Sequence, residues 1–412
     1  MIEYWLVVAS SIGSSSSAAR AGADAEEQVL VQTRDSNRID EFEALRGAMA
    51  LWVVAGHVIH TVESGPSPAA WLRLLALNPY AVNVFIALSG FVIYALIDQK
   101  REPYGLYITR RALRLFPAYL FFLLLSILLL PMALGVLAPD VATNPRAAAR
   151  FAYLSDGWRE FWPHLAAHLL LLHGLVPQDL LPNAEYAFIG QAWSISVEWQ
   201  FYLIAPLLYL AFERNAWLAS LGVAAMAVAT RLWLGGIANQ GFIGFYLDYF
   251  LFGILAYLVW RRRAALSGRQ FAGVVVACAL GGVAALRYEL SLGIWLFACA
   301  GTLLLHRAEG GWVTRLGRLT VCNPVAQFLG RISYSVYVSH MVVLYAAVWA
   351  MRAIWPDRPI GLAALMAATM AGTLLLSHVT YLWVERPGMQ WGKSLRPFRR
   401  GVALPDPVVR QG

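Results

Sequence analysis

Long apolar runs constrain this chain more than any other feature. Runs of about 17 to 25 residues recur along the sequence, which is the length that one helix needs to cross a bilayer. Of the 412 residues, 59% are hydrophobic and only 14% are charged. Inside a bilayer every backbone N–H and C=O group must find its hydrogen-bond partner within the protein, so runs of this length predict helices rather than strands. The sequence therefore predicts an all-α, polytopic transmembrane helical bundle.

The distribution of Lys and Arg predicts the topology, because these residues accumulate on the cytoplasmic side of a membrane. With about ten spans and both termini in the cytoplasm, most Lys and Arg residues fall inside. If the short segment 161–175 also crossed, every later loop would change sides, and most of the Lys and Arg residues would fall outside. We therefore expect that segment to lie in the interface and the loop 137–195 to face outward. The predicted spans are residues 45–62, 79–97, 114–136, 196–212, 216–234, 242–260, 271–287, 291–306, 332–351 and 360–384.

Three regions are expected along the chain. Residues 1–36 contain a Ser/Ala tract and predict a disordered cytoplasmic tail, or a stretch upstream of the natural start codon. Residues 37–387 form the membrane domain, and residues 388–412 form a cytoplasmic C-terminal tail. The three cysteines have no metal-ligand spacing, so no metal site is expected. The net charge of +8 follows from the topology and predicts no nucleic-acid partner.

Arg46 and His57 are the most informative polar residues within the apolar runs. Eleven residues at 100° each complete three helical turns with about 20° left over, so both side chains lie on one face, roughly 16 Å apart along the axis. An arginine at a helix end reaches the interface cheaply, whereas an ionisable group at membrane depth predicts function. We therefore expect His57 to be catalytic, with Arg46 at the cytoplasmic end.

Three further arginines, Arg110, Arg111 and Arg114, open the third predicted span at the level of Arg46. Spacings of three and four residues put Arg111 and Arg110 on faces next to Arg114. Guanidinium groups bind phosphate with two parallel hydrogen bonds, so the group predicts a site for an anionic, nucleotide-like ligand. A purely topological role for these arginines is an equal alternative.

A polar set, Trp193, Ser194, Ser196 and Glu198, lies near the start of the fourth predicted span. Glu198 either stabilises a helix start or turns toward His57, where a carboxylate would fix the imidazole tautomer. The pair Ser89 and Gly90 predicts close helix packing at mid-membrane. Tyr337 and His340, with Ser333, form another polar face. For His340 a structural role is favoured over a catalytic one.

Six motifs in order resemble the integral-membrane acyltransferase family 3, the bacterial O-acyltransferases. They are LRGAMALWVVAGH (45–57), FIALSGFVI (85–93), RRALRLFPAY (110–119), WSISVEWQFYL (193–203), ISYSVYVSH (332–340) and VERP (384–387). The resemblance implies that Arg46 and His57 are the essential pair, that Arg111 and Arg114 form an Arg-x-x-Arg element, and that Glu198 is the glutamate of a Ser-Val-Glu motif. Asn83 departs from the aspartate that many members carry, which puts a proton relay there in doubt.

The resemblance also implies the reaction. An acyl group, commonly acetyl, passes from cytoplasmic acyl-CoA to a hydroxyl of a glycan, a glycolipid or a macrolide-type acceptor at the bacterial inner membrane. Coenzyme A phosphates would bind Arg46, Arg111 and Arg114, with Arg110 beside them, and the acceptor would contact Trp193, Ser194, Ser89, Tyr337 and His340. His57 would act as general base or as an acyl relay.

A transporter or flippase for a glycan or a small polar solute is an alternative from another class. Buried ionisable groups such as His57, Arg231 and Glu198 would fit a transport path equally well on physical grounds. A third alternative is an acyltransferase-like scaffold without turnover. Release of free CoA that depends on a hydroxyl acceptor would distinguish the enzyme from both.

Overall fold

The described part of the chain consists of helices and the turns between them, with no strand. The computed structural model describes residues 39–62, 69–308, 311–356 and 358–396. The chain divides into two units, Met1–Glu41 and Phe42–Gly412, and nearly all described residues belong to the second. The predicted disordered tail, residues 1–36, lies outside the described residues. Of the predicted C-terminal tail, residues 388–394 belong to a helix, and residues 397–412 are outside the described residues.

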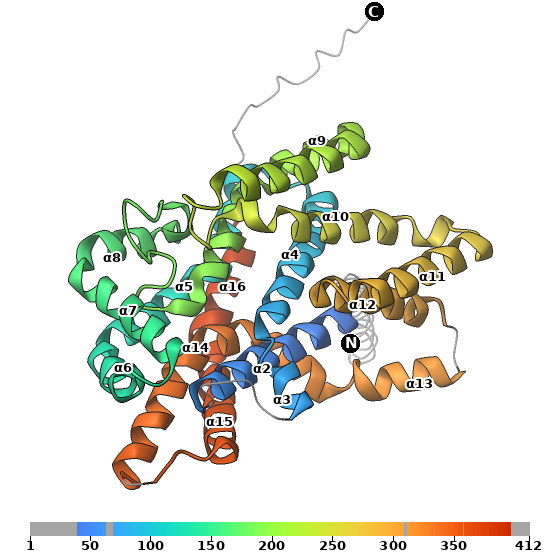
Figure 1. Cartoon of the computed structure of the whole chain (residues 1–412). Coiled ribbons are helices and arrows are strands. Elements are labelled where there is room, and N and C mark those ends of the chain that lie inside the picture. The colour runs from blue at the N-terminus through green and yellow to red at the C-terminus, as the bar shows by residue number, and fades with distance from the viewer. Residues whose placement is uncertain (1–38, 63–68, 309–310, 357, 397–412) are drawn as a thin grey trace, which may run out of the picture. The chain divides into compact units, whose positions relative to one another are not determined.

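Ten helices have 15 residues or more, and five are shorter (Figure 1). The longer ones are α2 (Asp40–Val62), α4 (Asn78–Lys100), α5 (Tyr104–Leu128), α7 (Pro145–Arg159), α9 (Trp193–Ala229), α10 (Leu247–Arg261), α11 (Gly268–Ala285), α12 (Leu290–Arg307), α14 (Pro324–Ile354) and α15 (Leu362–Thr380). The shorter ones are α3 (Ala70–Leu75), α6 (Leu130–Leu137), α8 (Phe161–Leu169), α13 (Gly311–Thr320) and α16 (Arg386–Ser394). Single π-helical segments, Thr230–Leu234 and Tyr381–Glu385, extend α9 and α15.

Nine helices of the described residues are long and apolar enough to cross a membrane. The predicted polytopic helical bundle is therefore confirmed. The count of nine rather than ten reflects α9, where two predicted spans, 196–212 and 216–234, join into one element. Asn215 interrupts this element with φ −156° and ψ 97°. Its side chain accepts a hydrogen bond from Leu218 N at 3.0 Å, so Asn215 is the N-cap of the second arm.

The connection between α5 and α9 contains α6, α7 and α8, which pack against one another (Figure 1). Helix α8 has nine residues, so it is about 14 Å long and covers half of a hydrocarbon core of about 30 Å. The segment 161–175 therefore does not cross as a helix, as expected. Its three histidines, His164, His168 and His173, are buried within the protein.

Two glycines allow α4 and α10 to cross in direct backbone contact. A Cβ atom on Gly90 would lie 2.4 Å from the carbonyl oxygen of Phe250, and one on Gly253 would lie 1.9 Å from that of Ala87. The predicted close packing at Ser89 and Gly90 is confirmed. Because α4 is held this close to α10, the Ser89 hydroxyl reaches α9, where it donates to Glu198 Oε1 over 3.2 Å.

Candidate functional site

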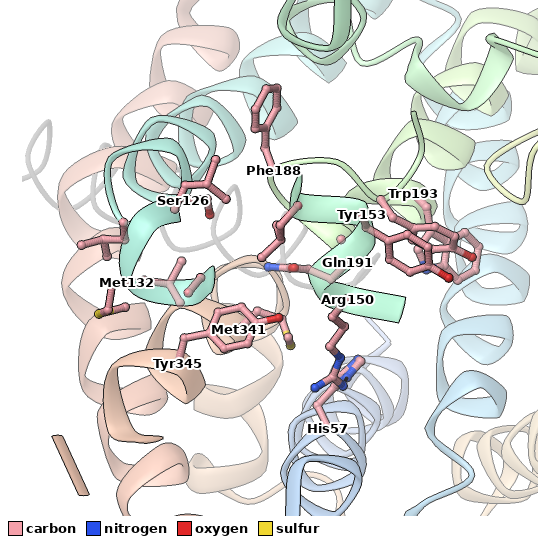
Figure 2. Close-up of a pocket in the computed structure, with 17 residues that line it drawn as sticks. His57, Ser126, Met132, Arg150, Tyr153, Phe188, Gln191, Trp193, Met341 and Tyr345 are labelled. Carbon is pink, nitrogen blue, oxygen red and sulfur yellow. Dashed lines mark hydrogen bonds between the residues drawn. The ribbon is translucent and has the colours of Figure 1, made fainter. Parts of the chain in front are cut away.

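Two cavities lie along α2, and each contains one member of the Arg46–His57 pair. The His57 cavity has a volume of about 190 Å³, and the arginine cavity has a volume of about 150 Å³. The lining of the first includes His57, Arg150, Tyr153, Tyr186, Trp193 and Tyr345 (Figure 2). The lining of the second includes Arg46, Ser89, Arg111, Arg114, Glu198 and Tyr337. Because α2 is one continuous helix from Asp40 to Val62, Arg46 and His57 lie roughly 16 Å apart along its axis.

Arg150 is the polar partner of the His57 ring. One guanidinium nitrogen donates to His57 Nδ1 over 2.9 Å, and another donates to Thr61 Oγ1 over 3.1 Å. Figure 2 shows the Arg150 side chain pointing toward His57. A guanidinium only donates, so Nδ1 must carry the lone pair, and this contact assigns the neutral imidazole with its proton on Nε2. The basic nitrogen of His57 is therefore occupied by Arg150.

The start of α7 brings Arg150 to this position. The Asn144 side chain caps the helix by accepting from Arg146 N at 3.0 Å and from Ala147 N at 3.3 Å, and Pro145 takes the first helical position. Asn144 Nδ2 also donates to the His60 carbonyl oxygen over 3.4 Å, which joins α7 to the end of α2. The Asn-Pro pair was a readable helix-start signal. Arg150 contacts a histidine 93 residues away in the sequence. No local pattern predicts this contact, and the sequence analysis missed it.

His340 stands beside His57, with ring centroids 5.1 Å apart. Its Nδ1 donates to the Tyr337 carbonyl oxygen over 2.7 Å. The other ring nitrogen, Nε2, is buried and has no hydrogen-bond partner in the described residues. His340 lines neither cavity, so it contacts the catalytic candidate rather than the space where a substrate would lie.

A hydrogen-bonded cluster at the start of α9 lies between the two cavities. Trp193 lines the His57 cavity, whereas the next residue, Ser194, lines the arginine cavity. The Tyr337 hydroxyl donates to the Gln191 carbonyl oxygen over 3.0 Å and lies 2.7 Å from Ser194 Oγ. The structure thus brings together Ser194 and Tyr337, two candidates 143 residues apart in the sequence.

Three guanidinium groups line the arginine cavity, and their hydrogen bonding differs. Arg46 pairs with Glu43 at 3.2 Å. Arg114 pairs with Glu385, whose side chain is fully buried. Arg111 makes no ion pair with a described residue, and its buried Nε has no hydrogen-bond partner among them. Arg111 is therefore the member of this group with unused capacity to bind an anion.

Arg110 does not join this group. It pairs with Glu102 and donates to the carbonyl oxygens of Gly392 and Leu395, at 2.9 and 2.7 Å. These contacts fasten the C-terminal helix α16 to α5. The expectation that four arginines meet is corrected to three, because the 100° step from Arg110 to Arg111 turns the first side chain toward α16.

The hypothesis that Glu198 turns toward His57 is wrong in this structure. Glu198 accepts hydrogen bonds from Ser89 and Tyr202, and it lines the arginine cavity. The first turns of α9 carry its side chain to α4 instead. Glu198 is therefore near Arg46, Arg111 and Arg114, and it adds one negative charge to a cavity with three positive ones.

Buried histidines outside the spans form a separate, structural group. The rings of His168 and His173 stack with centroids 4.0 Å apart. Burial lowers the pKa of His173 to about 4, and burial together with the neighbouring His173 lowers the pKa of His168 well below its usual value. Each ring donates through Nε2 to a backbone carbonyl oxygen, His168 to that of Ala184 over 3.0 Å and His173 to that of Ala192 over 3.2 Å. These histidines hold the connection between α8 and α9 in place.

The helical bundle and the two polar cavities along one helix define a class of protein, the multi-pass membrane proteins with an internal site. Comparison with known families agrees, because residues 39–378 match the acyltransferase domain that characterises acyltransferase family 3. The chain belongs to this family.

Two curated proteins are similar over most of their length. One, described as a membrane-bound transacylase, is BcsY of Komagataeibacter xylinus, with 28% identity over 89% of this chain and 88% of BcsY. The other is the acyltransferase MdmB of Streptomyces mycarofaciens, with 25% identity over 90% of this chain and 96% of MdmB. No solved structure matches the chain.

Proposed function

We propose that this membrane acyltransferase moves an acyl group, most simply acetyl, from acyl-CoA to a hydroxyl of a glycan, glycolipid or macrolide-type acceptor in the bacterial inner membrane. The observation that carries the proposal is the pair of cavities on one helix. Arg46, Arg111 and Arg114 line the arginine cavity, and His57 lines the other cavity. A donor with phosphates at one end and a thioester at the other fits this division.

The donor binds through its anionic end in the arginine cavity. Arg111 has unused hydrogen-bond donors there, and Arg46 and Arg114 add positive charge. The thioester arm then extends along α2 past Ser194 and Tyr337, the hydrogen-bonded pair between the two cavities. Rotation of the Tyr337 side chain opens this path, and it breaks the hydrogen bonds of the Tyr337 hydroxyl to Ser194 Oγ and to the Gln191 carbonyl oxygen.

The chemistry needs one proton acceptor beside the acceptor hydroxyl. The hydroxyl oxygen attacks the thioester carbonyl carbon, the C–S bond breaks, and His57 takes the hydroxyl proton. The imidazolium then returns that proton to the CoA thiolate, so the products are the ester and free CoA. The alternative route is an acyl-histidine relay, in which His57 attacks the thioester first, CoA leaves, and the acceptor hydroxyl then takes the acyl group from the imidazole.

The test is His57→Gln in purified, membrane-reconstituted protein, with His306→Gln as the matched control. His306 is an exposed histidine that packs on Trp260, away from both cavities. We expect His57→Gln to lower acceptor-dependent CoA release by about 100-fold or more, as general-base removal typically does. His306→Gln should keep the wild-type rate. Near wild-type turnover in a folded His57→Gln variant would refute the catalytic role, and solute movement without CoA release would favour a transporter.

A further inference from the structure

Two arginines on one face of α7 contact two histidines on one face of α2. Arg150 donates to His57 Nδ1 over 2.9 Å, and Arg146 donates to His60 Nδ1. The arginines are four residues apart and the histidines are three residues apart, which are the spacings of one helix face. Both guanidinium groups therefore have neutral ring nitrogens as partners.

No carboxylate compensates these two positive charges in the described structure. Neither Arg146 nor Arg150 forms an ion pair with a described residue, and no Asp or Glu lines the His57 cavity. Burial and the neighbouring Arg150 cation both lower the pKa of Arg146. Arg146 is exposed, whereas Arg150 is half-buried and lines the cavity, so Arg150 is the cation that an anionic ligand there would pair with.

The remaining walls of the His57 cavity are mainly aromatic and aliphatic. Tyr153 and Tyr186 stack with ring centroids 4.8 Å apart, and Trp193 and Tyr345 add two further rings. A few charged groups in an otherwise apolar cavity are typical of a site that orients a small ligand. Here the orienting group that points at the base is Arg150.

We propose that the His57 cavity selects an acceptor that carries a carboxylate or phosphate beside its reactive hydroxyl, and that Arg150 leaves His57 Nδ1 to bind this anion. The proposal rests on the proposed function. A guanidinium binds an oxyanion through two charge-assisted hydrogen bonds, which are stronger than its single bond to a neutral imidazole. Binding of the acceptor thus frees the lone pair that the reaction needs.

This exchange makes the base available only when an acceptor is present. In the free enzyme, Arg150 occupies Nδ1, and His57 cannot activate a water molecule through that nitrogen. Wasteful hydrolysis of the thioester is suppressed for the same reason. Arg150 is therefore a specificity-determining residue that also controls the base.

The first test measures binding and needs no acyl donor. Full-length protein in detergent is titrated calorimetrically with glucuronate, glucose 1-phosphate and glucose. We expect the wild type to bind at least one anionic sugar about ten-fold or more tightly than glucose, since a desolvated charge pair is worth at least that much. The two anionic sugars distinguish a carboxylate source from a phosphate source. Arg150→Gln should remove the preference, and Arg159→Gln, which changes an exposed arginine on the same helix, should keep it.

The results that overturn the inference are equally definite. Equal affinity of the wild type for charged and neutral sugars would overturn the inference, and so would no measurable binding of either anion. A preference that survives in Arg150→Gln would also do so. If Arg150→Gln does not fold, Arg150→Lys replaces it, and a preference at the full wild-type level in that variant would contradict a role for the paired guanidinium donors.

The second test concerns the control of the base. We expect Arg150→Gln to raise CoA release in the absence of any acceptor several-fold over wild type, because Nδ1 is then free. An unchanged or lower background rate would overturn the release step. If the wild type releases no CoA with any acceptor but still binds the anions through Arg150, the proposed function fails while the anion site stands.

Discussion

At the scale of single residues, hydrogen-bond partners separate side chains that look alike in the sequence. Arg110 and Arg111 are neighbours with the same chemistry. Arg110 donates its hydrogen bonds to Glu102 and to the backbone of the C-terminal region. The Nε of Arg111 is buried without a partner among the described residues. We therefore propose Arg111 as the residue that binds the donor, whereas Arg110 holds α16.

This difference predicts opposite phenotypes for adjacent substitutions. Arg111→Ala should raise the apparent KM for acyl-CoA about ten-fold or more, which corresponds to the loss of one charge-assisted hydrogen bond. Arg110→Ala should leave that KM within about two-fold and lower thermal stability instead, since it loosens α16. Steady-state kinetics at saturating acceptor and a thermal melt check both. An unchanged KM in Arg111→Ala would return these arginines to a topological role.

The histidines of the α8–α9 connection predict a pH dependence of stability. An unfolded histidine binds a proton near pH 6.5, whereas folded His173 does so only at about pH 4. Its folded pKa is lowered, so its contribution is complete above pH 6.5 and is lost as the pH falls from 6.5 to about 4. We expect the thermal midpoint to decrease over that range and the decrease to be smaller in His173→Gln. Equal pH profiles for the two proteins would contradict this.

At the scale of elements, caps and close contacts determine where the cavities form. Helix α7 begins at an Asn-Pro pair and is tied to His60, so its next turn reaches His57. Helix α9 begins beside Gln191 and sends Trp193 and Ser194 into different cavities. The site is thus built from helix starts that converge on α2, rather than from one contiguous segment.

Two asparagine caps allow this to be tested with a matched pair. Asn144→Ala and Asn215→Ala each remove an N-cap, and each should cost about 1 kcal/mol of stability. Only Asn144 positions Arg150, so only Asn144→Ala should weaken discrimination between anionic and neutral acceptors. Melting curves and competition assays on both variants provide the comparison. Equal discrimination in the two variants would show that the α7 cap does not position the site.

At the scale of the whole molecule, composition predicted a helical bundle, and the described helices confirm it. The orientation in the membrane stays a prediction, which rests on the excess of Lys and Arg in the loops assigned to the cytoplasm. The predicted orientation requires Arg269, after α10, to face the cytoplasm, and Arg159, at the end of α7, to face outward.

Cysteine labelling tests this orientation directly. In a background that lacks Cys278, Cys299 and Cys322, a membrane-impermeant maleimide added to intact cells should label Arg159→Cys. It should label Arg269→Cys only after the cells are opened. The reverse pattern would invert the topology and place the arginine cavity on the outer side, away from cytoplasmic acyl-CoA.

The sequence by itself determined the features of this protein that depend on local physics. Apolar run length predicts the helices, and the 100° step per residue puts Arg46 and His57 on one face. Contacts between distant segments were not readable, because hydrogen bonds across 93 and 109 residues depend on how helices pack. The tertiary structure alone therefore decides that Arg150 rather than Glu198 is the partner of His57 and that Arg110 points away from the arginine cavity. The physical reason is that helix crossing angles and helix starts set those distances, and no local sequence period encodes them.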